Sequence, residues 1–306
     1  MKHVVSLSLG SSKRDKTVQT ELFGESFEIS RIGVNGDQAL FMKRLAELDG
    51  TVDAIGFGGM DRYLWSAGRR YEFRASKKLL AGATKTPVLD GSGLKNTLER
   101  ETVRYLAENG VVDFKNHKTL MVCGVDRFGM SEALAEQGGP LVFGDLMFSL
   151  DVPYAIKSAA SHRQIAKTLL PIITQMPLSL LYPMGEKQNK ITPKWGEWYR
   201  WGDTIAGDFL YIRRFMPTAE SGDLNGKVIL TNTTTEDDER ELALRGVRLL
   251  ITTTPNFDGR SFGTNVMEAV LVAMNGGKSL AEADYLKMLK DLNWKPNIRP
   301  LSKDSL

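Results

Sequence analysis

The sequence predicts an α/β protein built from two domains. Its 306 residues suffice for two units of ordinary size, because compact domains cluster at roughly 100–150 residues. Apolar residues make up 42% and charged residues 25% of the chain, which is the balance of a globular protein able to bury a core. Short apolar runs of strand length alternate with amphipathic runs of helical length, and this alternation is typical of α/β folds.

The first hundred residues contain several of these alternations. Residues 37–48 place apolar side chains at helical spacing, beginning with Leu40 and Phe41. A later helix follows Asn96 or Thr97, either of which is a suitable capping residue. The expected elements of this part are strands at 4–9, 27–33, 52–57 and 87–89 and helices at 37–48, 75–83 and 98–108.

A second series of alternations begins at Thr119. A strand at 119–123 enters a glycine-containing turn, a helix at 130–137 follows, and the next strand, 141–144, ends in Asp145. This order is typical of a mononucleotide-binding unit and predicts a Rossmann-like, doubly wound sheet. Further expected elements are strands at 204–207, 227–230 and 248–252, a helix at 236–244 and a final helix from 279 to about 292.

These elements divide the chain into two expected domains. Residues 1–110 are expected to form an N-terminal α/β substrate domain with a connecting helix, and residues 111–306 a Rossmann-like nucleotide-binding domain with a C-terminal helix. An inserted segment, 146–200, is rich in Pro, Trp, Tyr and Lys, and its length suits a lid or a dimer contact. We expect a homodimer, the common state of soluble enzymes.

Composition narrows the classes of partner and site. Lys and Arg number 40 against 37 for Asp and Glu, a net charge of +3, so a basic domain and a nucleic-acid partner are not expected. Cys123 is the sole cysteine, so no internal disulfide can form. The longest apolar region, 168–182, is shorter than the roughly 18–20 residues that span a bilayer. We therefore expect a cytoplasmic protein without a membrane partner, and the spacing of its three histidines predicts no metal site.

The turn from Gly124 to Gly129 is the strongest candidate for a cofactor site. The first glycine permits a tight turn, the last permits close packing of the helix, and a helix N-terminus attracts phosphate. Asp126 replaces the middle glycine, so its carboxylate must point away from a bound pyrophosphate. Asp145 is placed to accept hydrogen bonds from ribose hydroxyls, which favours NAD over NADP; it is equally suited to capping the following helix. The expected cofactor contacts are Gly124, Val125, Arg127, Phe128, Gly129, Asp145, Asn232 and Thr233.

Other polar residues are candidates for catalysis and substrate binding. Lys95 lies between a glycine-rich loop and a capped helix, where a desolvated amine serves acid/base chemistry, although a surface lysine is an equal alternative. The expected catalytic residues are Lys95, Asn96, Thr97 and Asp126. Two loops leave strands on glycine and offer N–H groups beside cations, which suits a carboxylate or phosphate, unless they are merely solvated. Their expected substrate contacts are Ser11, Ser12, Lys13, Arg14, Asp61 and Arg62.

The order of these parts resembles the shikimate/quinate dehydrogenase group, and over most of the chain it is similar to bacterial proteins labelled quinate 5-dehydrogenase. The resemblance implies a substrate domain, a connecting helix and a C-terminal Rossmann domain. In that group the connecting helix follows an Asn-Thr-Asp motif; Asn96 and Thr97 match, and Leu98 stands where the aspartate belongs. The group's Asn-Val-Thr-x-Pro-x-Lys segment is absent, so Lys95 is not its equivalent.

The sequence therefore predicts an NAD-linked dehydrogenase of a small, anionic, polyhydroxylated carboxylic acid such as quinate or shikimate. One alternative is a non-redox enzyme, a lyase, transferase or isomerase, in which Asp126 acts on the substrate or binds a ribose. Another is a metabolite-binding protein that retains the dehydrogenase fold, which the missing lysine and aspartate motifs favour.

Overall fold

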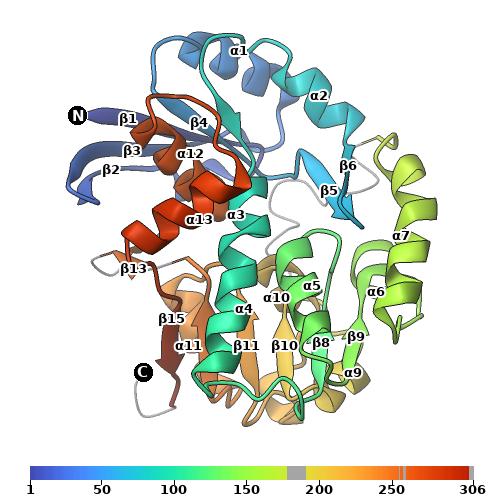
Figure 1. Cartoon of the computed structure of the whole chain (residues 1–306). Coiled ribbons are helices and arrows are strands. Elements are labelled where there is room, and N and C mark those ends of the chain that lie inside the picture. Colours follow the sequence, from blue (N-terminus) through green and yellow to red (C-terminus); the bar gives the residue numbers. More distant parts are fainter. Residues whose placement is uncertain (178–190, 255, 258–259, 303–306) are drawn as a thin grey trace. The chain divides into compact units, whose positions relative to one another are not determined.

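The computed structural model describes residues 1–177, 191–254, 256–257 and 260–302 (Figure 1). Its contacts group the chain into two units, each an α/β unit with a mainly parallel sheet, so the predicted α/β class and the division into two parts are confirmed. The segments of each unit alternate along the chain. Unit 1 draws its described residues from Met1–Leu94, Leu169–Gln188 and Gly263–Trp294, and unit 2 from Lys95–Thr168, Asn189–Phe262 and Lys295–Leu306.

Unit 1 contains a five-stranded sheet in the order β2-β3-β1-β4-β7. Four strands are parallel, and β2 pairs antiparallel with the edge of β3 through a tight turn in which Phe23 and Gly24 both adopt positive φ. The sequence analysis missed β2, because most of its side chains are exposed and no apolar alternation marks it. The strands are β1 (Lys2–Ser8), β2 (Lys16–Leu22), β3 (Glu25–Gly33), β4 (Ala54–Gly58) and β7 (Val88–Leu89).

The helices of unit 1 come from both ends of the chain. Helix α1 (Gln38–Leu48) is capped by Asp37, whose side chain accepts a hydrogen bond from the Leu40 N–H at 2.9 Å. Helix α12 (Thr264–Met274) is apolar on nearly every side and packs against β1, β4 and β7, as its almost complete burial requires. The remaining helices near this sheet are η1 (Ser12–Arg14), α2 (Arg74–Leu80), α3 (Ser92–Asn96) and α13 (Glu282–Asp291).

A separate β-hairpin lies between the main-sheet strands β4 and β7 in the sequence. Strands β5 (Tyr63–Ser66) and β6 (Arg69–Glu72) pair antiparallel, and their two-residue turn, Ala67-Gly68, has positive φ at both positions. This hairpin was not predicted, because its polar and aromatic residues do not form the apolar run of a buried strand.

Unit 2 contains a six-stranded sheet in the order β15-β12-β11-β10-β8-β9. Five strands are parallel and β15 (Asn297–Pro300) runs antiparallel along the edge beside β12. The strand order reverses between β8 and β10, because β9 lies on one side of β8 and the later strands on the other. The predicted strands of this part are confirmed, with ends shifted by one or two residues, as β8 (Thr119–Met121), β9 (Leu141–Phe143), β10 (Thr204–Ala206), β11 (Val228–Thr231) and β12 (Leu249–Thr252).

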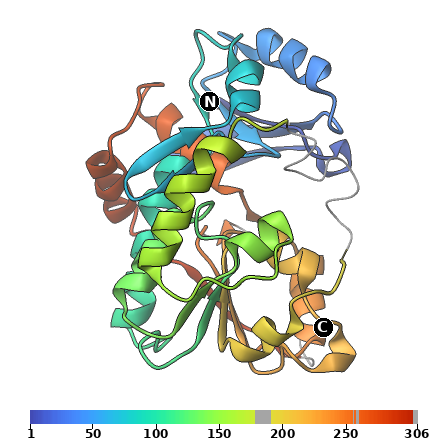
Figure 2. The same cartoon turned by 90° about the vertical axis from the view of Figure 1, so that its right-hand side faces the viewer.

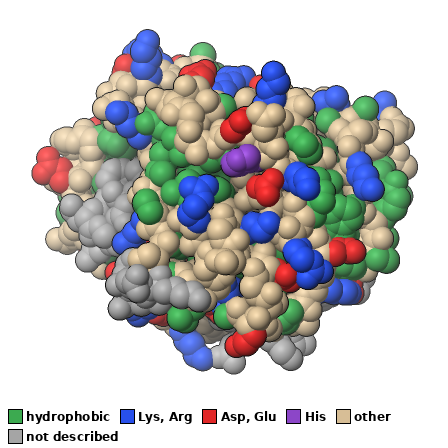
Figure 3. Space-filling view, turned by 90° about the horizontal axis from the view of Figure 1, so that it is seen from below, with side chains coloured by type: hydrophobic (Ala, Val, Ile, Leu, Met, Phe, Trp, Pro, Cys, Tyr) green, Lys and Arg blue, Asp and Glu red, His purple; other side chains and the backbone are tan. Residues whose placement is uncertain are grey.

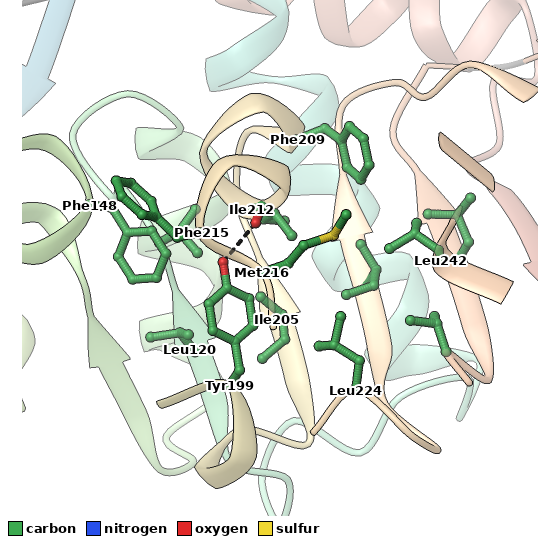
Figure 4. Packing of buried hydrophobic residues seen from close by; sticks show 14 of the residues in the cluster. Leu120, Phe148, Tyr199, Ile205, Phe209, Ile212, Phe215, Met216, Leu224 and Leu242 are labelled. Carbon is green, nitrogen blue, oxygen red and sulfur yellow. Dashed lines mark hydrogen bonds between the residues drawn. The ribbon is translucent and has the colours of Figure 1, made fainter. Parts of the chain in front are cut away.

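Two hydrophobic clusters cover the opposite faces of this sheet. Alternate strand residues serve each face: Leu120 and Ile205 join one cluster, and Met121 and Ala206 join the other. Figure 4 shows the first cluster, in which the fully buried Tyr199 donates a hydrogen bond to the Ile212 carbonyl at 2.7 Å. Helices α4 (Leu98–Glu108), α5 (Phe128–Glu136), α6 (Asp145–Leu150), α9 (Gly196–Trp201), α10 (Phe209–Phe215) and α11 (Glu236–Leu244) belong to the same unit, whose ribbon is also drawn in Figure 2. Helix α7 (Ala159–Ile173) begins in unit 2 and ends in unit 1, because the division falls after Thr168.

None of the described helices is both long and apolar enough to cross a bilayer.

Gly129 permits the close packing that brings α5 against the end of α3. A Cβ added at Gly129 would lie 2.0 Å from the Lys95 carbonyl oxygen and 3.0 Å from the Asn96 Cα. We therefore predict that Gly129→Ala lowers the free energy of unfolding by about 1–3 kcal/mol, through displaced backbone. Chemical denaturation measures the loss. Gly82→Ala is the matched control, because a Cβ at Gly82 meets nothing within 4 Å; equal effects of the two substitutions would refute the packing argument.

Candidate functional site

Polar residues follow the strands of the unit 2 sheet at their carboxyl ends. Asp126 and Arg127 lie in the turn after β8, Asp208 follows β10 and Asn232 follows β11. The strand order reverses between β8 and β10, so the connections after these two strands lead to opposite sides along the sheet. Open α/β sheets bind ligands at such a reversal, which makes this edge the candidate site.

A buried charge network occupies the centre of the site. The Lys95 ammonium donates to Asp126 Oδ1 at 2.7 Å, so these two predicted residues are brought together. Arg127 donates to Glu99 Oε1 at 2.6 Å and to Asp208 Oδ2, and its Nε lies 3.4 Å from Asp126 Oδ2. The network thus contains two cations and three carboxylates. Neither Glu99 nor Asp208 was predicted, because both are distant in sequence from the turn that carries Arg127.

Glu99 is the most deeply buried member of this network. Its side chain is fully inaccessible on α4, and Oε2 has no hydrogen-bond partner among the described residues. Burial raises the pKa of Glu99, against the lowering effect of the charges of Arg127 and Lys95. Burial therefore outweighs the two neighbouring cations in its effect on this pKa.

Asn232 ties the ends of three strands together. Its Oδ1 accepts from the Phe209 N–H at 3.3 Å and from the Thr231 hydroxyl at 3.0 Å, and its Nδ2 donates to Asp208 Oδ2 at 3.0 Å. The backbone carbonyl of Asn232 accepts a hydrogen bond from the Thr254 hydroxyl at 2.8 Å. The sequence analysis predicted Asn232 as a cofactor contact, and the structure places it at the carboxyl edge of the sheet, partly exposed.

Asp145 and His162 form a second polar pair at this edge. Asp145 is the first residue of α6, and its Oδ1 accepts from the Val125 N–H at 3.0 Å and lies 3.1 Å from His162 Nε2. The imidazole stacks on Phe143 with 4.2 Å between ring centroids. Burial favours the neutral acid, but the charge of His162 and hydrogen bonds from it, Val125 and Gly124 outweigh burial and lower the pKa of Asp145. The carboxylate is thus engaged within the protein.

Cys123 lies beside this pair and is buried. Burial, followed by the negative charges of Asp145 and Asp126, raises the pKa of its thiol well above the usual value. Its Sγ lies 3.3 Å from the Ser149 hydroxyl. The thiol therefore stays protonated.

The other predicted residues of unit 2 have structural positions nearby. Asn96 Oδ1 accepts from Arg100 at 3.3 Å. Thr97 stands at the N-cap of α4, but its side chain makes no capping bond, because the backbone there stays in the α region after α3. Phe128 is buried at the start of α5, and Thr233 is partly exposed after β11.

The predicted substrate residues belong to unit 1. Ser11 to Arg14 follow β1, and Asp61 and Arg62 follow the neighbouring strand β4, at the same edge of that sheet. Ser11 Oγ accepts from the Lys13 N–H at 3.2 Å, and Ser12 bonds to Asn35. Arg62 pairs with Glu72 at 3.0 Å. The Arg14 side chain lies outside the described atoms.

Unit 1 also contains a buried carboxylic acid that the sequence analysis did not identify. Glu268 lies on α12, where its Oε1 accepts from the Tyr285 hydroxyl at 2.7 Å and from the Gly93 N–H at 2.9 Å. Burial, followed by the negative charge of Asp90, raises the pKa of Glu268 to about 7. The signal that could have identified Glu268 from the sequence is its position as the one carboxylate in a largely apolar helix.

Two family models match the chain. The first, described as "Domain of unknown function (DUF8753)", covers residues 3–90, and the second, described as "Domain of unknown function (DUF8754)", covers residues 93–301. A search of curated proteins finds no match.

Solved structures similar to the chain include three solute-binding proteins of ABC transporters. One, from Burkholderia multivorans, is 11% identical, covers 99% of this chain and 100% of its own, and has a TM-score of 0.40. One from Actinobacillus succinogenes with bound D-allose is 12% identical over 99% and 98%, with a TM-score of 0.38. The arabinose-binding protein of Shewanella sp. ANA-3 is 13% identical over 92% and 88%, with a TM-score of 0.38.

The resemblance to the shikimate/quinate dehydrogenase group is wrong, and so is the predicted oxidation of quinate or shikimate. The family models that match the chain are those of two domains of unknown function, and neither is a dehydrogenase family. The geometry of the turn gives the physical reason. Asp126 is buried in ion pairs where the motif has a glycine, and the Val125 N–H is already bonded to Asp145. NAD binding stays a prediction.

The buried pair of Lys95 and Asp126 is predicted to be important for folding. Lys95→Met leaves a buried carboxylate with fewer compensating charges, so the free energy of unfolding falls by about 3–5 kcal/mol. The matched control is Lys194→Met, which breaks the exposed pair with Asp151 and changes stability by about 0–1 kcal/mol. Urea denaturation of both variants makes the comparison. An equally small loss of unfolding free energy in both variants would show that the buried Lys95 pair matters no more to stability than an exposed pair.

The raised pKa of Glu268 predicts a pH-dependent stability. An unfolded glutamate ionises near pH 4.5, whereas folded Glu268 keeps its proton up to about pH 7. The folded state therefore binds more protons between these values, so the stabilisation from neutral Glu268 is complete below about pH 4.5 and is lost as the pH rises through about 7. Glu268→Gln removes this loss and gains on the order of 3 kcal/mol over wild type across that interval.

Denaturation at a series of pH values tests this prediction. Glu47→Gln, at an exposed position on α1, is the control and should follow the wild-type profile. Parallel profiles for wild type and Glu268→Gln would rule out a titrating Glu268.

Proposed function

We propose, for a chain that belongs to the family described as "Domain of unknown function (DUF8754)", that it is a binding protein for a small, uncharged, polyhydroxylated metabolite. The ligand would bind at the carboxyl edge of the unit 2 sheet, without redox chemistry. The carrying observation is the convergence of Arg127, Asp208 and Asn232 at the ends of β8, β10 and β11. Hydrogen bonds between these side chains fix their orientation before a ligand arrives, which reduces the ordering cost of binding.

The charge balance of the site supports an uncharged ligand. Glu99, Asp126 and Asp208 contribute three carboxylates, and Lys95 and Arg127 contribute two cations. A carboxylate or phosphate on the ligand would meet a region in which both cations are already paired. A ligand hydroxyl, by contrast, can donate to an acid oxygen and accept from an amide or threonine hydroxyl. The anionic metabolite of the sequence analysis is therefore replaced by a neutral one.

The shape of the sheet supports binding of a ligand other than a dinucleotide. The parallel strands follow the order β9-β8-β10-β11-β12, which is that of a doubly wound sheet with its reversal beside β8. The usual dinucleotide-binding sheet has a further parallel strand beyond the second one, whereas in the described part of this sheet β9 is followed only by a single antiparallel bridge between Phe143 and Ile156.

The contacts of Asp126 favour binding over catalysis. One carboxylate oxygen faces Lys95 and the other faces Arg127, so the group is held as an ion pair and not as a free base. A general base needs its oxygen within hydrogen-bond reach of a substrate proton. The metabolite-binding alternative is therefore preferred to the lyase, transferase or isomerase alternative.

Isothermal titration calorimetry tests the proposal. Neutral probes are D-ribose, D-glucose and myo-inositol; quinate and NADH are the anionic comparisons. We predict that at least one neutral probe binds and that quinate does not. Asp208→Asn should weaken the binding by roughly tenfold. The asparagine side chain has one acceptor oxygen in place of two, so it no longer accepts hydrogen bonds on two oxygens from Arg127 and a ligand hydroxyl. Asp113→Asn, an exposed acid before β8, is the matched control and should bind as wild type does.

The outcomes that contradict the proposal are distinct from one another. Tight binding of NADH, weakened by Asp145→Ala, would restore the nucleotide hypothesis. Binding of quinate alone would show that the site is made for an anion. If none of the neutral probes bound at millimolar concentration, the proposed class of ligand would be wrong.

A further inference from the structure

The positive charge of the chain is concentrated in one short segment. Residues 62–78 carry six basic side chains and one acidic one, whereas the whole chain has a net charge of +3. The remainder of the chain is therefore slightly negative. This segment comprises the β5–β6 hairpin and α2, all within unit 1 (Figure 1). Its basic residues are Arg62, Arg69, Arg70, Arg74, Lys77 and Lys78.

Five of these six cations are exposed and form no ion pair with a described residue. Only Arg62 is paired, with Glu72. Elsewhere in the described chain, arginines such as Arg100 and Arg213 each face two carboxylates. The face in Figure 3 likewise shows basic and acidic side chains interspersed. The exposed cations of the segment are Arg69, Arg70, Arg74, Lys77 and Lys78.

The arginines of the hairpin are held against aromatic rings. The Arg70 guanidinium lies 4.8 Å from the Trp65 ring centre and 5.4 Å from that of Tyr63. Trp65 and Arg70 are direct cross-strand partners, so the stack follows from the register of the hairpin. The Arg69 guanidinium lies 5.1 Å from the ring centre of Tyr71, two residues further along the same strand. These contacts orient two planar cations while leaving them exposed.

The base of the hairpin is also fixed. Asp90, which follows β7, accepts hydrogen bonds from the N–H groups of Arg62 and Tyr63 at 3.1 and 3.2 Å. The turn at the other end needs only Ala67 and Gly68, both with positive φ. The arginines therefore stand on a rigid ribbon attached to the sheet of unit 1.

We propose that the β5–β6 hairpin and α2 bind single-stranded nucleic acid. Exposed cations without an acidic partner can pair with phosphates, which are the main source of affinity for nucleic acids. An arginine whose inner face lies on an indole offers its outer face to a base, and stacking on guanidinium planes is a common mode of single-strand recognition. A duplex hides its base faces, so the single strand is the form that gains from the stack. The sequence analysis did not expect a nucleic-acid partner, because the net charge of the whole chain is low. That net charge does not reveal a local group of cations, so this proposal replaces the earlier expectation.

Fluorescence anisotropy with a labelled oligouridylate tests the proposal on the full chain. Arg69→Ala/Arg70→Ala should weaken binding by roughly tenfold and reduce the salt dependence by about the amount of two phosphates, near 0.7 each in the slope. The matched control is Lys287→Ala/Lys290→Ala, which removes the same charge from exposed positions of α13 in the same unit and should leave binding unchanged.

Arg70→Lys separates stacking from charge. It keeps the positive charge but removes the planar group over Trp65, so affinity should fall severalfold while the salt dependence stays the same. Thermal melts of each variant confirm that the exposed substitutions leave the fold intact.

Several results would overturn the proposal. These are the absence of oligouridylate binding at low salt, equal losses in the hairpin and α13 variants, and tighter binding of a duplex of the same length. Equal binding of polyglutamate or of phosphatidylserine vesicles would show a surface that recognises charge alone. The calorimetric test of the polyol site is independent, because that site lies in unit 2.

Discussion

The carboxyl edge of the unit 2 sheet depends on one guanidinium, that of Arg127. It contacts carboxylates from three places in the chain: Glu99 on α4, Asp126 beside it in the turn after β8, and Asp208 after β10. Three acids brought so close together would repel one another without it, and burial would add a desolvation cost for each. Lys95 completes the compensation through Asp126. This network of ion pairs holds the loops at the strand ends in place and sets the charges of the proposed site.

The pKa values of the buried acids shift in different directions because the surroundings of these acids differ. Asp145 faces a histidine and backbone N–H groups, so its pKa is lowered although it is buried. Glu268 has only neutral donors and a nearby Asp90, so burial prevails and its pKa is raised to about 7. Glu99 has cations beside it and its pKa is still raised, because its side chain is completely inaccessible. Burial of a carboxylate therefore does not by itself predict its charge.

Local patterns in the sequence predicted most of the regular elements, and contacts between distant residues were beyond them. The predicted helix at 236–244 is α11 without change, because its apolar spacing and capping Thr235 lie within one short segment. Asn232 was recognised from its place after a strand. The β5–β6 hairpin was missed, because its stability depends on cross-strand pairs of arginine and aromatic residues and not on an apolar run. The partners of Arg127 were missed because Glu99 and Asp208 meet it only after folding. The family inference failed for a related reason: it rested on the order of the parts and on Asn96 and Thr97, and neither indicates the ion pairs that occupy the turn after β8.

The most direct test of the polyol site is the location of the bound ligand. Amide chemical shifts of the labelled protein, recorded during a titration with the neutral polyol that binds, report which backbone N–H groups the ligand affects. The account predicts that the shifts cluster in the turn after β8, at Asp208 and Phe209, and around Asn232, because these groups converge at one edge of the sheet. Shifts confined to unit 1, or shifts at this edge produced only by quinate or NADH, would contradict it.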